Sequence, residues 1–454
     1  MPSRRPSFRT EHDARSGRGS FRTEHDARSG RGSFRTEHDV RSGRGVKRPV
    51  EYSILYTATL CTLAVGAVMV YSASSAESVL EGAGGDPAAF LKRFVFLGLI
   101  GLLALHYLSR HGLALVRRAT PMLLGVSFAL TVAVMVPGIG VTINGATRWL
   151  GAGPLQFQPS ELLKVSLVLY AARLLADRPE SVKTLRTLAR PLLLVVGAAC
   201  LLLLKQPDMG TAMVICFSMG ALLVAAGTPV RHLGVLAGSL FVAAGLLAVV
   251  EPYRMARLTA FVHPFEDAGD TGFQAVQALT AIGSGGLFGV GLGESVQKIF
   301  YLPEAHTDMI LAIIGEELGV MGMIGVAVLY GMIGYAGLRA AKAARDRYSK
   351  LLATGITSLI LCQATLNFFA VLGMAPLTGI PLPFISYGST NLIVLLAGMG
   401  LVLNVAATGG LAQRGRKPRL QAIDGGGHAD DRDRRRRDSG TRDPGPGRRR
   451  RAAG

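Results

Sequence analysis

Residues 301–319 read YLPEAHTDMILAIIGEELG, a short polar run that passes without a break into an apolar helical stretch. The polar run holds Glu304, His306 and Asp308, and the apolar stretch holds Glu316 and Glu317. A carboxylate is costly to keep where water meets hydrocarbon, so an acidic residue retained there is a functional candidate. The stretch predicts a chain that enters a membrane directly after this acidic run.

The composition separates into an apolar middle and two basic tails. Apolar residues make up 49% of the chain and the mean hydropathy is +0.36, yet the formal net charge is +19. Residues 1–50 hold thirteen Lys and Arg against six Asp and Glu, and residues 411–454 hold fourteen against six. The tails therefore carry most of the charge, and we expect residues 51–410 to form one membrane domain.

Apolar runs of about 20 residues, the length that crosses a bilayer, recur along this middle part. They predict an all-α polytopic membrane protein with about ten transmembrane helices, although the tight turn at 206–210 would also fit one long buried hairpin. The runs are residues 53–72, 90–109, 119–137, 159–176, 190–205, 209–227, 231–250, 308–337, 351–375 and 385–408.

Short basic loops predict the orientation, because Lys and Arg collect on the cytoplasmic side. Basic residues follow the second, fourth, sixth and eighth runs, on the same side as both tails. The long stretch 251–308, between spans 7 and 8, is acidic and falls on the other side. We therefore expect both termini in the cytoplasm and a long extracytoplasmic loop at 251–308.

The N-terminal tail is a tandem repeat. SFRTEHDARSGRG at 7–19 recurs at 20–32 and again at 33–45, where Val40 replaces alanine. A polar repeat without apolar periodicity cannot build a core, so we expect both tails to be disordered. Their arginines favour contact with anionic membrane lipids over nucleic acid, for which no role is predicted.

Four polar clusters fall on the predicted outer side: 144–164, 205–212, the loop that ends at Asp308, and 376–391. Ionisable groups that meet at one membrane depth indicate a polar cavity, because lipid offers them no partners. Arg148, Lys164 and Glu161 of the first cluster would suit a phosphate-bearing ligand, while Trp149 also fits an interfacial anchor. Asp208 of the second cluster also fits a helix cap.

Two further features have structural readings. The glycine run GSGGLFGVGLGE at 283–294 is not interpreted as a nucleotide-binding loop, because no βαβ unit precedes it. Glu316 and Glu317, about two turns into the eighth predicted span, are expected to be structural through pairing with a cation of the first cluster.

The strings NGATRW, QPSELLK, KQPDMGTA, YLPEAHTDMILAIIGEELG and PLTGIPLPFISYGSTN, in this order, closely resemble the SEDS family of shape, elongation, division and sporulation proteins. The resemblance covers residues 51–410. EAHTD, with SVQK before it, is more similar to the division branch of the family than to the elongation branch. Gly388 to Asn391 depart from the Gly-Gly-Ser-Ser stretch of many relatives.

The resemblance implies a multi-pass enzyme of the cytoplasmic membrane that polymerises lipid II into glycan strands of peptidoglycan outside the membrane, at the division septum. Implied partners are lipid II, the nascent glycan strand, a class B penicillin-binding protein and other divisome proteins. Asp308 is the expected catalytic base. The expected substrate-binding residues are Arg148, Lys164, Glu161, Gln206, Asp208, His306, Thr307, Lys298, Ser386 and Tyr387, and the expected structural residues are Glu316, Glu317 and Pro383.

Other readings stay open at this point. The same cavity would serve a lipid II flippase or other transporter, an elongation-type polymerase, or a scaffold that recruits the partner synthase. No metal site of the protein's own is predicted, although a divalent cation such as Mg²⁺ or Mn²⁺ would suit the pyrophosphate leaving group.

Overall fold

The computed structural model describes residues 49–80, 86–143, 145–152, 155–250, 252–266, 268–269, 272–299 and 301–415. The predicted disordered tails, with the three repeats, lie almost wholly outside these residues. The last helix continues to Gly415, past the predicted start of the second tail at 411.

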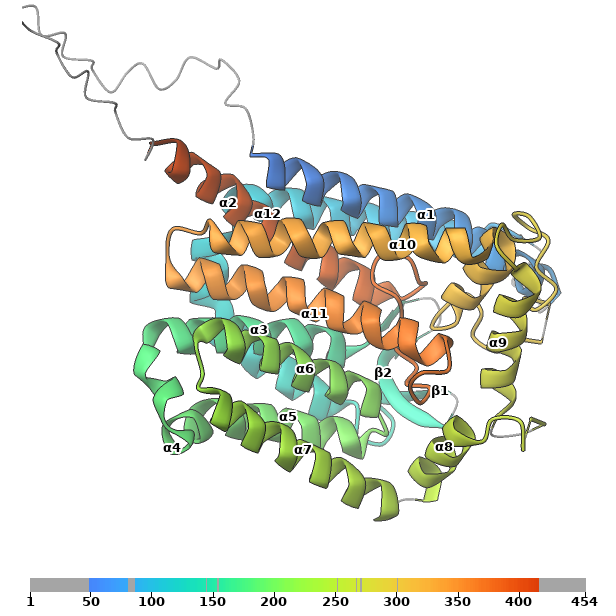
Figure 1. Cartoon of the computed structure of the whole chain (residues 1–454), viewed down its shortest axis with the longest axis horizontal. Helices are drawn as coiled ribbons and strands as arrows, with labels where there is room; N and C mark the ends of the chain where they lie inside the picture. The colour runs from blue at the N-terminus through green and yellow to red at the C-terminus, as the bar shows by residue number, and fades with distance from the viewer. Residues whose placement is uncertain are drawn as a thin grey trace, which may run out of the picture. The chain divides into compact units, whose positions relative to one another are not determined.

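The described chain is mainly helical, and its long helices run side by side (Figure 1). The helices are α1 (Val50–Leu80), α2 (Ala89–Ala133), α3 (Pro159–Asp177), α4 (Leu185–Leu188), α5 (Leu194–Lys205), α6 (Met209–Ala226), α7 (Val230–Val250), α8 (Pro252–Val262), α9 (Phe273–Gly285), α10 (Ile310–Lys342), α11 (Arg347–Val371) and α12 (Ser389–Gly415), with the short segments η2 (Pro179–Lys183) and η3 (Ala189–Leu193) on either side of α4.

By length and composition, seven helical stretches of the described chain can cross a membrane: α1, α2, the run Leu185–Lys205 from α4 to α5, α6, α10 from Gly319, α11 and α12. The prediction of about ten includes three further crossings. α3 carries the charged residues Glu161, Lys164, Arg173 and Asp177, and the apolar part of α7, Val230–Leu246, is shorter than the seven. The third comes from α2, which crosses twice.

α2 holds two of the predicted spans in one 45-residue helix. Such a helix would extend about 68 Å if straight, yet both of its ends reach one polar cavity: Phe90 lines it, and the Thr131 carbonyl accepts a hydrogen bond from Gln206 beside it. Between them, Arg117 pairs with Asp177 at the other end of α3. The helix therefore bends back near Arg117 and makes both crossings.

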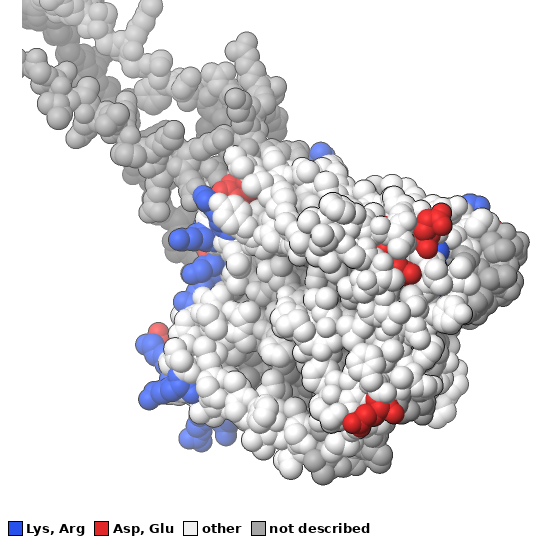
Figure 2. Space-filling model, turned by 45° about the vertical axis from the view of Figure 1, so that its right-hand side comes forward, with Lys and Arg blue, Asp and Glu red and all other residues white. Residues whose placement is uncertain are grey.

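Arg117, Arg339 and Arg347 mark one end of the bundle, named here the basic end; the cavity lies at the opposite end, the cavity end. Arg117 lies 2.6 Å from Asp177, and Arg339 lies 3.5 Å from Glu51 at the start of α1. Arg347 donates to carbonyls in the last turns of α3 and α6. Figure 2 shows Lys and Arg side chains gathered at one end, and a largely uncharged surface elsewhere.

The structure corrects the all-α expectation in one place. Part of the first polar cluster and the residues before it form an antiparallel sheet of β1 (Gly140–Ile143), β2 (Ala146–Ala152) and β3 (Leu155–Phe157), in that order. Val141, Thr142 and Ile143 are β-branched and favour a strand. Gly145, with φ +75°, occupies the turn between β1 and β2, a backbone conformation that glycine adopts readily.

The eighth span begins later than predicted. Gly319 has φ +68° and ψ −168° inside α10, so the helix breaks there, and the apolar crossing runs from Gly319 to Lys342. Glu316 and Glu317 consequently lie in a helical piece before the crossing. They are not two turns inside the span, as the unbroken apolar pattern had indicated.

Glycines permit the closest helix contacts. A Cβ atom on Gly400 of α12 would lie 2.5 Å from the Leu105 carbonyl oxygen and 2.8 Å from the Leu105 Cα of α2. A Cβ on Gly66 of α1 would lie 2.6 Å from the carbonyl oxygen of Phe384. Backbones approach this closely only where side chains are absent, as small residues allow in membrane helices.

We expect Gly400→Ala to destabilise the bundle, because the added methyl group has to push α2 and α12 apart. Overpacking of this kind costs about 1–3 kcal/mol, measurable as a lower melting temperature in detergent. Gly220→Ala in α6 is the matched control, because nothing lies within 4 Å of its Cβ position. An equal melting temperature for Gly400→Ala and Gly220→Ala would contradict the close contact.

Candidate functional site

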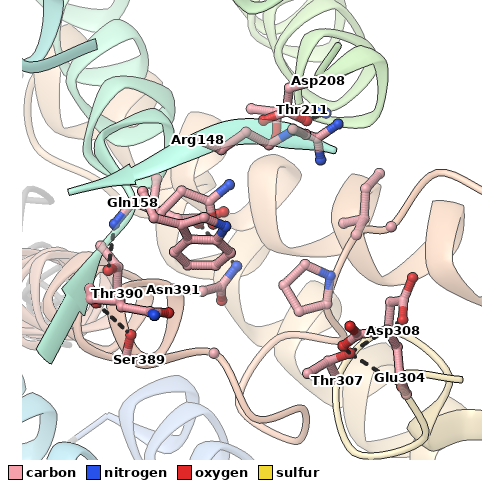
Figure 3. A pocket seen from close by; sticks show the side chains of 18 of the residues that line it. Arg148, Gln158, Asp208, Thr211, Glu304, Thr307, Asp308, Ser389, Thr390 and Asn391 are labelled. Atoms are coloured by element: carbon pink, nitrogen blue, oxygen red, sulfur yellow. Dashed lines mark hydrogen bonds between the residues drawn. The ribbon is translucent and has the colours of Figure 1, made fainter. Parts of the chain in front are cut away.

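A cavity of about 1100 Å³ opens at the cavity end of the bundle. Residues from all four polar clusters line it, which confirms that these clusters converge. Figure 3 shows Arg148 and Asp208 on one wall and Glu304, Thr307 and Asp308 across from them. Its charged lining residues are Arg93, Arg148, Glu161, Lys164, Lys205, Asp208, Arg257, Glu304 and Asp308.

Asp308 lies in the turn that leads into α10, and its carboxylate faces the cavity. The Thr307 hydroxyl lies 3.2 Å from Asp308 Oδ1 and 2.7 Å from Glu304 Oε2. A hydroxyl has one proton, so it serves one of these two carboxylates at a time. The site therefore holds an acidic pair bridged by a single hydroxyl donor.

The pKa of the Asp308 carboxyl is raised to about 7, and burial is the largest cause of the rise. The negative charge of Glu304 contributes to the rise, while hydrogen bonds from the Asp308 backbone amide and the Thr307 hydroxyl and the positive charge of Arg257 oppose it. A carboxyl with this pKa exchanges its proton near neutral pH, as a general base requires.

Asn367 of α11 holds the Asp308 turn through hydrogen bonds to backbone carbonyls. Its Nδ2 donates to the Asp308 carbonyl (2.7 Å) and to the Ile380 carbonyl (2.8 Å). Gly379, next to Ile380, has φ +65°, and a Cβ there would lie 3.7 Å from Asp308 Oδ2. The irregular fourth cluster therefore packs directly against the acidic turn.

Lys164 and Glu161 of α3 form a buried ion pair of 2.9 Å. Asn391 donates to Glu161 Oε2 (2.9 Å), and Lys164 donates to Gln363 Oε1 of α11 (3.0 Å). Gln363 in turn donates to the Pro381 carbonyl (2.8 Å). Lys164 therefore lines the cavity with its charge already balanced.

Arg148 lies on β2, with its guanidinium against the turn between α5 and α6. It donates to the carbonyls of Gln206 (3.1 Å) and Pro207 and still lines the cavity. Trp149 lines the cavity too, which places it inside the site and not only at a lipid interface. Asp208 caps α6 by accepting from the Thr211 amide (3.2 Å) while it faces the cavity.

His306 and Tyr387 belong to an aromatic cluster with Phe90 of α2. Ring centroids lie 4.6 Å apart for Phe90 and His306, and 5.1 Å apart for Phe90 and Tyr387. The Tyr387 amide also donates to the His306 carbonyl (3.0 Å). All three side chains line the cavity, so ring contacts join the loop that ends at Asp308 to the fourth polar cluster and to α2.

Three residues expected to bind substrate lie outside the cavity lining. Gln206 is buried and donates to Thr131, and Ser386 accepts from the Leu382 amide. Lys298 is buried, 2.9 Å from Glu317. Each has a polar group that is bonded within the protein.

The residues expected to be structural do make internal bonds. The Pro383 carbonyl accepts from the Tyr330 hydroxyl. Glu317 accepts from Lys298 and from Ser72 of α1, and Glu316 accepts from the Val296 amide (3.0 Å). The partner of Glu317 is thus a cation of the long loop and not one of the first cluster, as the sequence had suggested.

The sequence patterns predict no role at the cavity for Gln363 and Asn367, nor for Arg93 and Arg257, which line it. The apolar stretch 351–375 predicts only a membrane span, although its two amides, four residues apart, share one face of the helix. This spacing indicates a polar face on the helix, because polar side chains inside a span need partners.

A divalent cation would find few protein ligands here. In the described part of the chain, no group of three or more His, Cys, Asp and Glu side chains could hold a metal ion. Mg²⁺ often binds through one or two carboxylates together with substrate phosphates, and the Asp308 and Glu304 pair is the arrangement that could supply them.

Comparison with known proteins agrees with these features. The family model described as "Cell cycle protein", of FtsW, RodA and SpoVE, matches residues 52–409. The probable peptidoglycan glycosyltransferase FtsW of Thioalkalivibrio sulfidiphilus is 42% identical over 77% of this chain and 88% of its own length. Stage V sporulation protein E of Bacillus subtilis is 38% identical over 78% of this chain and 96% of its own length.

Solved structures show the same fold. A chain from a structure on the coordination of polymerisation and crosslinking by a peptidoglycan synthase complex is 31% identical, with a TM-score of 0.64, over 78% of this chain and 96% of that chain. The rod shape determining protein RodA of Thermus thermophilus is 31% identical, with a TM-score of 0.56, over 78% and 95%. This chain therefore belongs to the FtsW, RodA and SpoVE family of cell cycle proteins, the SEDS family that its motifs resemble.

Proposed function

We propose that this protein is a peptidoglycan glycosyltransferase that polymerises lipid II during septal wall synthesis. The observation that carries the proposal is the Asp308 carboxyl, held in a polar cavity with Arg148 on the facing wall. The relative named as a probable peptidoglycan glycosyltransferase supports the reaction class. Membership of the division branch is supported by the EAHTD and SVQK strings.

The charge distribution supports an outward-facing site. The basic end, with Arg117, Arg339 and Arg347, faces the cytoplasm under the positive-inside rule. The start of α1 and the end of α12 both belong to that end, so we place both termini in the cytoplasm. The cavity then opens on the outer face of the membrane, where lipid II is polymerised.

In the proposed reaction, Asp308 takes the proton from the acceptor sugar hydroxyl. The hydroxyl oxygen attacks the anomeric carbon of the donor from the face opposite the pyrophosphate. The new glycosidic C–O bond forms as the bond to the leaving oxygen breaks, so the configuration inverts and the electron pair stays on the prenyl pyrophosphate. Asp308 then gives its proton to solvent.

Positive charge has to stabilise the departing pyrophosphate. We assign direct contact to Arg148, whose guanidinium faces the cavity while it rests on backbone carbonyls. Lys164 acts differently, because Glu161 and Gln363 already hold its ammonium group. We assign it the role of positioning the wall between α3 and α11.

A class B penicillin-binding protein is the proposed partner, since the solved synthase complex couples polymerisation to crosslinking. The transporter alternative predicts no glycan from purified protein in detergent, where there are no two membrane sides. Polymer formed there from lipid II would therefore favour the enzyme.

We expect Asp308→Asn to lower the polymerisation rate by about 10²–10⁴-fold, the usual contribution of a general base. Glycan length and yield from lipid II in detergent measure it. Asp86→Asn is the control, because Asp86 precedes α2 outside the cavity lining and pairs with Lys92 on the surface. Parental rates in Asp308→Asn would disprove the assignment of the base.

The polymerisation rate should rise with pH, because Asp308 acts in its ionised form and its pKa is about 7. One such group predicts a rise of about tenfold between pH 6 and pH 8. Glu304→Gln removes a neighbouring negative charge, which lowers the pKa and should shift the profile toward lower pH. A shift toward higher pH would contradict the proposed coupling of the two carboxyls.

Arg148→Ala should reduce the rate by about 10²-fold or more, as expected when a donor placed at developing charge is lost. Arg148→Lys should recover part of it, because charge returns without the planar fork. Arg186→Ala is the control, because Arg186 lies near Asp177 at the basic end and outside the cavity lining. Melting temperatures of all variants separate a catalytic loss from unfolding, and an unchanged rate in Arg148→Ala would remove Arg148 from the mechanism.

A further inference from the structure

Residues 286–299, named here the glycine segment, follow α9 and present apolar side chains outward. Phe288 is 80% exposed, and Leu287 is 60% exposed. The exposed apolar side chains of the segment are Leu287, Phe288, Val290, Leu292, Val296 and Ile299. Exposed apolar side chains gathered in one short segment point to contact with a protein or a membrane.

The glycine segment is held rigidly against the break in α10. Val290 and Gly291 donate their amides to the carbonyls of Glu316 (2.9 Å) and Glu317 (3.1 Å). In return, the amides of Val320 and Met321 donate to carbonyls of the segment at 3.0 and 3.1 Å. The two stretches therefore pair through their backbones.

Glycine makes this pairing sterically feasible. Gly289 has φ +83°, and a Cβ atom there would lie 2.1 Å from the Glu317 carbonyl oxygen. Gly319 has φ +68°, and its Cβ would lie 2.4 Å from the Gly289 amide nitrogen. The glycines thus fix the position of the exposed side chains relative to α10.

The charged side chains on the inner side of the glycine segment, Glu316, Glu317 and Lys298, all have hydrogen-bond or ion-pair partners within the protein. Ser295 and the Val296 amide donate to Glu316, and Lys298 pairs with Glu317. Irregular backbone at membrane depth is tolerated only where such groups find partners inside the protein. The segment meets that condition on its inner side while its outer side is apolar.

The exposed apolar surface continues onto the membrane-crossing part of α10. Met321, Ile324 and Val328 are each about half exposed on that crossing, which is long and apolar enough to span a membrane. The Met321 amide donates to Leu287, so the outward side chains of the segment begin where this lipid-facing surface begins. Glu294, exposed within the segment, limits the depth to the head-group region.

We propose that the glycine segment is inserted into the membrane leaflet at the cavity end, with Phe288, Leu287 and Leu292 among the acyl chains just below the head groups. Its partner is the lipid surface. The segment anchors the long loop to the bilayer a few residues before the Asp308 turn, a role separate from the reaction itself.

Tryptophan quenching in nanodiscs tests the proposal, because the chain has one tryptophan. In full-length protein, Trp149→Phe removes it and Phe288→Trp places a reporter on the segment. We expect strong quenching by lipids brominated near the head group, weaker quenching by lipids brominated near the chain ends, and protection from iodide in solution. Leu292→Trp repeats the measurement, and Ile324→Trp on α10 is the control for a deeper position.

Quenching by iodide with no effect of brominated lipids, for both Phe288→Trp and Leu292→Trp, would overturn the proposal. The surface would then face water and be available to a protein partner. Melting temperatures of the reporter variants show whether each is folded, so the result does not depend on one substitution.

Discussion

Two amide side chains of α11, Gln363 and Asn367, join the cavity walls that carry Lys164 and Asp308, and so fix the positions of these walls relative to each other. Gln363 bonds both Lys164 and the Pro381 carbonyl, and Asn367 bonds the carbonyls of Asp308 and Ile380. An amide donates and accepts without bringing a charge into the bundle. The cation on α3, the acidic turn and the irregular fourth cluster are therefore fastened to one buried helix.

Charges in this bundle divide into balanced pairs and an acidic centre. Glu161 with Lys164, and Glu317 with Lys298, are buried pairs, and breaking one partner of such a pair typically costs about 3–5 kcal/mol. Asp308 lies instead beside a second carboxylate, so burial and like charge keep its pKa near 7. The buried pairs thus stabilise the fold, while burial and the neighbouring carboxylate give Asp308 the pKa that a base requires.

The break at Gly319 separates a short first piece of α10, which follows the Asp308 turn, from the part that crosses the membrane. The piece before the break carries Glu316 and Glu317, which bind the long loop, and Ser72 of α1 binds Glu317. The Asp308 turn leads directly into this piece. Its position is therefore set from both sides, by α11 behind it and by the loop and α1 after it.

The sequence by itself determined the membrane class, most of the spans and the polar clusters that converge, one of which ends at Asp308. These follow from apolar run length and from the cost of charge in lipid, which act locally along the chain. The sequence does not predict the sheet that holds Arg148 or the helix break at Gly319. Both depend on strand pairing and close backbone contact, which the local sequence pattern does not show.

Only the tertiary structure decided the partners. Glu317 pairs with Lys298 and not with a cation of the first cluster, and Gln206 and Ser386 lie outside the cavity lining. Gln363 and Asn367 bond to Lys164 and to the Asp308 carbonyl from a helix that the sequence predicts only as a span. Each of these outcomes depends on which helix faces which, and hydrophobic periodicity shows that a face is buried without showing what lies against it.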